Sequence, residues 1–153
     1  MDLQLRGKHD LFTGSSRGLG YAIALGLASE GCRVAINGRN PQNLKDAADK
    51  LHTQTNVEIT PIPGDVGQPD FPSLLVQKTI QAFGGLDLLV TNAGGPPSGK
   101  FETFDDPAWQ LAIELSLLSH VRLIRAALPY LRQSDCASVV TMTSYSIKQR
   151  IGQ

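Results

Sequence analysis

Thr13-Gly14-Ser15-Ser16-Arg17-Gly18-Leu19-Gly20 is the stretch that decides the fold. It follows a short apolar run, Leu11-Phe12, and precedes an amphipathic segment from Tyr21, an order that predicts a strand, a glycine turn and a helix. Such a turn leaves unpaired backbone N–H groups at a helix N-terminus, where the helix dipole also favours negative charge. The glycines would let a phosphate or pyrophosphate approach the backbone closely. The spacing G-x-x-x-G-x-G differs from the standard dinucleotide fingerprint, so a simple turn is the alternative interpretation.

Length and composition indicate one globular domain. The chain has 153 residues, enough to bury a substantial core, and its formal net charge is zero. Because a neutral chain has no broad attraction for nucleic acid or an anionic membrane, we expect neither as a partner. Cys32 and Cys136 have no metal-binding or redox spacing, and we expect no metal site and two buried thiols. No apolar run resembles a signal core or a membrane span, so we expect a cytoplasmic protein.

Strand and helix patterns alternate along the chain. Strands are predicted at residues 8–13, 32–37, 57–62, 86–91 and 138–143. Helices are predicted at residues 18–30, from Asn40-Pro41 to beyond Leu51, at 70–83 and at 106–132. The last of these helices is expected to bend at Pro129. This alternation predicts an α/β fold, a doubly wound, Rossmann-like parallel sheet with the strand order 3-2-1-4-5. Pro61 removes a backbone donor, which places the third strand at the edge.

Two loops are expected to meet at the ligand-binding edge of this sheet. Ligands of such sheets bind beyond the carboxyl ends of the strands, near the switch point between strands 1 and 4. The glycine turn follows the first strand, and Asn92-Ala93-Gly94-Gly95 follows the fourth. Their convergence favours a dinucleotide site over a simple turn.

At these positions the chain resembles the classical short-chain dehydrogenase/reductase family. Residues 13–20 match its TGxxxGxG turn, and Asn92-Ala93-Gly94 matches its NAG motif. Asp65-Val66 lies where that family contacts the adenine ring, and residues 139–144 resemble the strand that ends in its catalytic serine. The resemblance covers the whole chain and extends to members described as 3-oxoacyl-carrier-protein reductase-like. It implies that residues 1–153 form a single NADP-binding Rossmann domain, the N-terminal portion of a longer reductase.

The end of the second strand bears on the choice of cofactor. An acidic residue about 20 positions after the glycine turn would bind the ribose of NAD, whereas an arginine suits the 2′-phosphate of NADP. The stretch Asn37-Gly38-Arg39 has no carboxylate, and Arg17 lies in the turn itself. Since guanidinium–phosphate pairing is strong and bidentate, we expect NADP(H) rather than NAD(H). The cofactor-binding residues implied are Gly14, Ser15, Ser16, Arg17, Gly18, Leu19, Gly20, Asn37, Arg39, Asp65, Val66, Asn92, Ala93 and Gly94.

The resemblance implies hydride transfer between a nicotinamide and a small carbonyl or alcohol substrate. Ser144 matches the serine that polarises the carbonyl, and Ser116 occupies the place of the asparagine that holds a water in the proton relay. The family's Y-x-x-x-K motif does not occur before Gln153, and Tyr145 and Lys148, which have another spacing, are interpreted as loop residues.

We therefore expect a chain truncated before that motif, without the family's last strands and inactive alone. The full-length protein is expected to be a homo-oligomeric enzyme. The alternative function is a non-catalytic NADP(H)-binding or sensing protein.

Asp10 is a misfit in the predicted first strand. The family usually carries a small apolar residue there, and the strand is central to the sheet. A buried carboxyl group requires a partner or a raised pKa. We therefore predict that Asp10 destabilises the fold.

Overall fold

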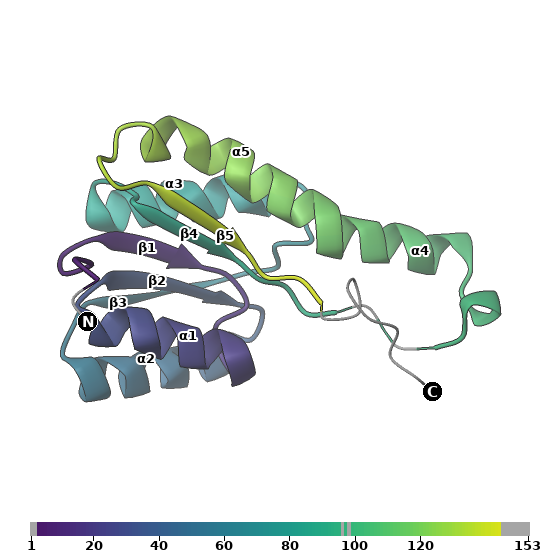
Figure 1. The fold of residues 1–153 in the computed structure, drawn as a ribbon. Coiled ribbons are helices and arrows are strands. Elements are labelled where there is room, and N and C mark those ends of the chain that lie inside the picture. Colours follow the sequence, from purple (N-terminus) through teal and green to yellow (C-terminus); the bar gives the residue numbers. More distant parts are fainter. Residues whose placement is uncertain (1–2, 96, 98, 145–153) are drawn as a thin grey trace.

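Five parallel strands form one sheet in the order β3-β2-β1-β4-β5. The computed structural model describes residues 3–95, 97 and 99–144. The strands are β1 (His9–Phe12), β2 (Arg33–Gly38), β3 (Ile59–Pro63), β4 (Leu88–Thr91) and β5 (Ser138–Thr141). Both the predicted α/β class and the predicted strand order are confirmed (Figure 1).

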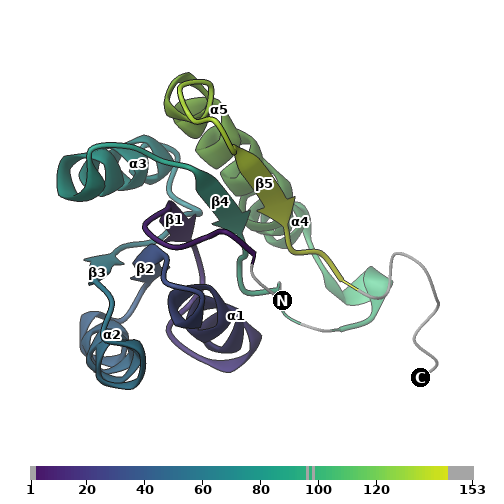
Figure 2. The same ribbon diagram turned by 60° about the vertical axis from the view of Figure 1, so that its left-hand side comes forward.

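Helices cover both faces of the sheet (Figure 2). They are α1 (Gly18–Ser29), α2 (Pro41–Thr55), α3 (Phe71–Phe83), α4 (Asp106–Ile113) and α5 (Ser119–Leu131), with the 3₁₀ turn η1 (Phe101–Thr103) and the π-helical segment η2 (Glu114–Leu118). Successive strand residues point to opposite faces, so Leu11 belongs to the core beneath α3 and α5, and Phe12 to the core beneath α1 and α2. No helix in the described part of the chain has the length and apolar character needed to cross a membrane.

Local signals in the sequence set several boundaries correctly. The side chain of Asn40 accepts a hydrogen bond of 2.9 Å from the backbone N–H of Asn43 and caps α2, whose first residue is Pro41. Gly31 follows α1 with a φ of +89°, a conformation that favours glycine. Pro61 lies in β3 at the edge of the sheet, as predicted.

The long helix predicted over residues 106–132 is wrong in one respect. It is divided into α4 and α5 by the π-helical segment Glu114–Leu118. Pro129 lies in the final turn of α5, two residues before its end at Leu131. A π turn inserts one residue without a proline or glycine, so composition did not reveal it.

Asp10 lies inside the apolar core, as its position in the sequence predicted. Its register partners are Val34 in β2 and Leu88 in β4, both members of the core beneath α1 and α2. The side chain has no exposed surface, and within the described structure neither carboxyl oxygen makes a hydrogen bond of normal geometry. Burial raises the pKa of this carboxyl well above its ordinary value, and the nearby backbone of Leu11 offsets the shift only in part.

Candidate cofactor-binding site

The glycine turn is shaped by close backbone contacts. Gly14 and Gly18 have φ values of +61° and +58°, which favour glycine. A Cβ at Gly20 would lie 2.2 Å from the carbonyl oxygen of Gly14, and a Cβ at Gly14 would lie 2.8 Å from Asn92. Packing therefore requires glycine at positions 14 and 20, and the last residues of the turn, 18–20, are the first residues of α1.

Side chains attach this turn to the end of β4. The Thr13 hydroxyl donates to the Asn92 carbonyl at 2.7 Å and accepts from the Asn92 backbone N–H at 2.9 Å. The Asn92 side-chain amide donates to the carbonyl of Gly14 at 3.0 Å. The loops after β1 and β4 are thus joined at the switch point of the sheet, where the sequence predicted that they would converge.

A second set of hydrogen bonds attaches the turn to the end of β2. The backbone N–H of Ser15 donates to the Asn37 carbonyl at 3.0 Å, and the backbone N–H of Asn37 donates to the Ser15 hydroxyl at 3.1 Å. The side-chain amide of Asn37 donates to the carbonyls of Ile62 and Gly64 at 2.9 and 3.2 Å. The side chains of Ser15 and Asn37 are buried in these contacts, so they hold the shape of the site rather than project from it.

Two arginines lie on the rim of the turn. Arg17 is the N-cap residue of α1, makes no capping hydrogen bond with its side chain, and is exposed. Arg39 directly follows β2 and is also exposed. Ser16 and Gly38 bring the two segments together, because a Cβ at Gly38 would lie 3.1 Å from the Ser16 hydroxyl oxygen. Leu19, in the first turn of α1, is 66% exposed on the same rim.

The remaining predicted contacts with the cofactor follow β3 and β4. Asp65 accepts a hydrogen bond of 2.9 Å from the backbone N–H of Gly67, and Val66 is buried in the core. Ala93 and Gly94 follow Asn92, and Gly94 is exposed. The turn after β3 lies beside the π-helical segment, since a Cβ at Gly67 would contact Leu115 at 3.7 Å.

The two predicted catalytic serines are on separate elements. Ser116 is exposed and lies within the π-helical segment η2. Ser144 is exposed and lies three residues beyond the end of β5. Tyr145 and Lys148 lie outside the described residues. The π turn at Ser116 was not predicted from the sequence.

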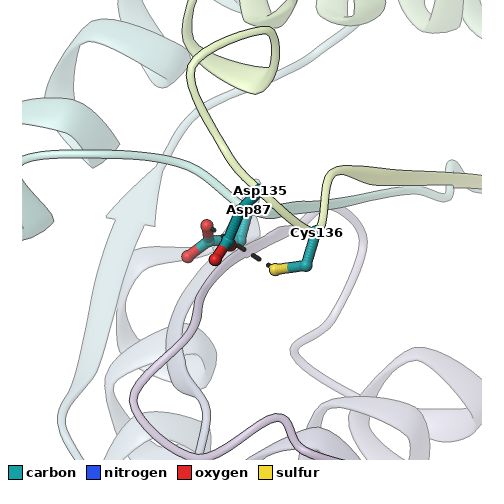
Figure 3. A group of neighbouring side chains, drawn as sticks. All are labelled: Asp87, Asp135 and Cys136. Atoms are coloured by element: carbon teal, nitrogen blue, oxygen red, sulfur yellow. Dashed lines mark hydrogen bonds between the residues drawn. The ribbon is translucent and has the colours of Figure 1, made fainter.

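A cluster of polar side chains lies at the amino ends of the strands, opposite the glycine turn (Figure 3). Ligand atoms of Asp87, Asp135 and Cys136 lie within 4.8 Å of one another. Asp87 accepts from the Ser134 hydroxyl at 2.6 Å, and Asp135 pairs with Lys8 at 3.0 Å. Both carboxylates thus have protein partners, and this cluster joins the amino ends of the strands.

One prediction about the cysteines is wrong. Cys32 is fully buried, and burial raises its pKa to about 12. Cys136, however, is exposed, because it lies in the turn that leads from α5 to β5.

A parallel sheet with a glycine turn at the switch point between β1 and β4 is the architecture of nucleotide-binding α/β proteins. The family model described as short chain dehydrogenase matches residues 8–152. The chain belongs to this family of oxidoreductases, as the sequence motifs predicted.

Known proteins resemble the chain over nearly its whole length. It is 36% identical over 141 residues to 11-beta-hydroxysteroid dehydrogenase 1A of Arabidopsis thaliana, covering 92% of this chain and 40% of the relative. It matches L-sorbose reductase from Gluconobacter frateurii, complexed with NADPH and L-sorbose, at a TM-score of 0.94 and 32% identity, covering 99% of this chain and 57% of that one. A short chain dehydrogenase from Burkholderia cenocepacia in complex with NADP gives a TM-score of 0.89 at 27% identity, with 97% and 60% covered. The chain thus spans 40% to 60% of the length of these relatives.

Proposed function

We propose that residues 1–153 form one NADP(H)-binding domain, the N-terminal part of a reductase that transfers hydride between the nicotinamide and a small carbonyl or alcohol substrate. The observation that carries the proposal is the glycine turn, held from both sides by Thr13–Asn92 and Ser15–Asn37 hydrogen bonds. A turn fixed in this way presents backbone N–H groups at the start of α1 without further rearrangement. The NADPH and NADP found in two similar structures agree with this assignment.

The cofactor contacts follow from the position of each group. Backbone N–H groups of residues 16–20 at the start of α1 would bind the pyrophosphate. Arg17 and Arg39, both exposed on the rim, would hold the 2′-phosphate by charge-assisted hydrogen bonds. Asp65 and Val66 would border the adenine, and Ala93 and Gly94 would border the nicotinamide ribose.

The catalytic part of the proposal concerns Ser144 and Ser116. The Ser144 hydroxyl would donate a hydrogen bond to the substrate oxygen, and the exposed Ser116 hydroxyl would hold a water of the proton relay. The 153 residues contain no Y-x-x-x-K, so this polypeptide has no tyrosine with a lysine at that spacing to supply the proton. We propose that the full-length protein is a homo-oligomer, because Trp109, Leu111 and Ile113 expose apolar surface on α4. A cytoplasmic location is a separate part of the proposal.

The test is a titration of the chain with NADPH and NADH. Replacing Arg39 by alanine removes one charged pair to the 2′-phosphate and should weaken NADPH binding by about tenfold or more, corresponding to about 1.5–3 kcal/mol. NADH affinity should not change, because NADH lacks that phosphate.

Arg125→Ala is the matched control, since Arg125 is an exposed arginine on α5, which packs on the opposite face of the sheet from α1. It should alter neither affinity. Equal losses of NADPH and NADH affinity in Arg39→Ala would contradict the assignment of Arg39 to the 2′-phosphate. An unsubstituted chain that binds neither cofactor would contradict the proposed function.

A further inference from the structure

The long helix changes its hydrogen-bonding pattern around Ser116. The backbone N–H of Ser119 donates to the carbonyl of Glu114, five residues earlier, in place of the four-residue bond of an α-helix. The Leu115 carbonyl, which would accept that N–H in an α-helix, accepts the Ser119 hydroxyl at 2.5 Å. Because Ser119 is fully buried, its hydroxyl keeps the displaced carbonyl satisfied inside the protein.

An ion pair spans this π turn. Nη1 of Arg122 lies 2.5 Å from Oε2 of Glu114, and the two side chains are only 23% and 27% exposed. Ion pairs within a helix ordinarily join residues three or four apart, whereas these two are eight apart. Partial burial reduces the screening of this pair by salt.

The eight-residue separation matches the π turn and does not match a continuous α-helix. Over eight residues an α-helix rotates by about 800°, which leaves the eighth side chain about 80° beyond two full turns. A π turn accommodates one more residue than an α turn, which takes up most of this offset and aligns the two side chains on one face. The ion pair therefore favours the π register over the α register.

The register determines where Ser116 points. Conversion of the π turn to an α turn would rotate the residues on its N-terminal side by about 100° relative to α5. Leu115 would then leave its place beside Gly67, next to the turn after β3. Ser116 would turn with it.

We propose that the Glu114–Arg122 ion pair stabilises the π register of residues 114–118, a role that we call the register lock. Both residues are then positioning residues for Ser116. The role of Ser116 rests on the proposed function, whereas the lock rests on the contacts across the turn. Neither residue touches the glycine turn in the contacts described above, so the lock and cofactor binding can be tested separately.

The test compares the full chain with Glu114→Gln, with Arg122→Met, and with the exchanged pair Glu114→Arg/Arg122→Glu. Amide hydrogen exchange over residues 111–123 and the amide NMR resonance of Ser116 are the measurements. Each single variant should accelerate exchange several-fold at residues 114–119 and displace the Ser116 resonance, while residues 126–131 keep their protection. The exchanged pair should restore most of the protection and return the resonance toward its original position, a rescue that a general loss of stability would not give.

Lys45→Met is the matched control, because it breaks the exposed Lys45–Asp49 pair on α2 and should leave residues 111–123 unchanged. Unaltered exchange and resonance in both single variants would overturn the lock, as would an exchanged pair that behaves like the singles. A chain that fails to bind NADPH but shows the expected exchange pattern would contradict the proposed function and leave the lock standing.

Discussion

Removing the Asp10 carboxyl should stabilise the protein. Asp10 is fully buried between Val34 and Leu88, and neither of its oxygens makes a hydrogen bond of normal geometry within the described residues. An unsatisfied buried polar group costs about 1–3 kcal/mol. We expect Asp10→Ala to raise the free energy of unfolding by about that amount, less the packing lost when the side chain is shortened.

The gain in unfolding free energy from Asp10→Ala should depend on pH. The pKa of Asp10 in the folded protein is raised above the ordinary value of 3.8. Below that ordinary value, Asp10 is protonated in both states and its ionisation has no effect on stability. Above it, the unfolded chain loses the proton and the folded chain keeps it, so the wild type loses about 1.4 kcal/mol of stability per pH unit until the pH passes the raised pKa. The advantage of Asp10→Ala should therefore widen as the pH rises above about 4, until the pH passes the raised pKa.

Urea unfolding at a series of pH values measures both effects. Asp10→Asn tests the origin of the slope, because asparagine has a similar size but does not ionise. Asp70→Ala is the control, since Asp70 is exposed and its side chain makes no capping hydrogen bond at the start of α3. It should change stability little at any pH.

The reasoning fails if Asp10→Ala lowers the midpoint of unfolding at every pH. That result would mean that the carboxyl has a stabilising partner and that the register of β1 differs. A stability difference that stays constant with pH would refute the raised pKa.

Two further predictions concern the glycine turn and the chemistry. Gly20→Ala should destabilise the chain by more than about 1 kcal/mol and weaken NADPH binding, since its Cβ would lie 2.2 Å from the Gly14 carbonyl oxygen. Gly26→Ala on the same helix meets nothing within 4 Å and should stabilise the chain by about 0.5–1 kcal/mol; thermal melts and NADPH titrations check both. A polypeptide of these 153 residues should not oxidise NADPH with a reactive diketone, because general acid catalysis typically contributes about 10²–10⁴-fold. Extension with the segment of a full-length relative that carries Y-x-x-x-K should restore turnover. Equal rates of NADPH oxidation for both polypeptides would assign the proton transfer to residues within the 153-residue chain.

Much of the fold was predictable because its signals are local. The glycine turn, the Asn40 cap and Pro61 each fix the chain conformation at or near their own positions, and all three agree with the structure. Strand ends were less accurate: the first strand predicted at 8–13 is His9–Phe12, since a run of apolar residues does not reveal where strand pairing stops.

The site was less predictable because its geometry depends on distant pairs. Nothing in the sequence shows that the Asn37 side chain donates hydrogen bonds to the carbonyls of Ile62 and Gly64. The π turn was missed because the residues around Ser116 keep a helical composition on either side of it. Cys136 was misassigned since burial of a cysteine was inferred from residue type alone.

The hydrogen bonds between Thr13 and Asn92 join residues 79 positions apart, and this separation has a consequence for the order of folding. Contacts of such long range form late, after the local helices and turns. An isolated β1–α1 unit would contain every glycine of the turn and still lack the shape that we propose binds a phosphate. That shape is completed only when β4 docks beside β1. A bound nucleotide would therefore oppose the separation of these two strands and raise the cost of global unfolding, whereas fraying at the β5 edge would proceed with the nucleotide in place.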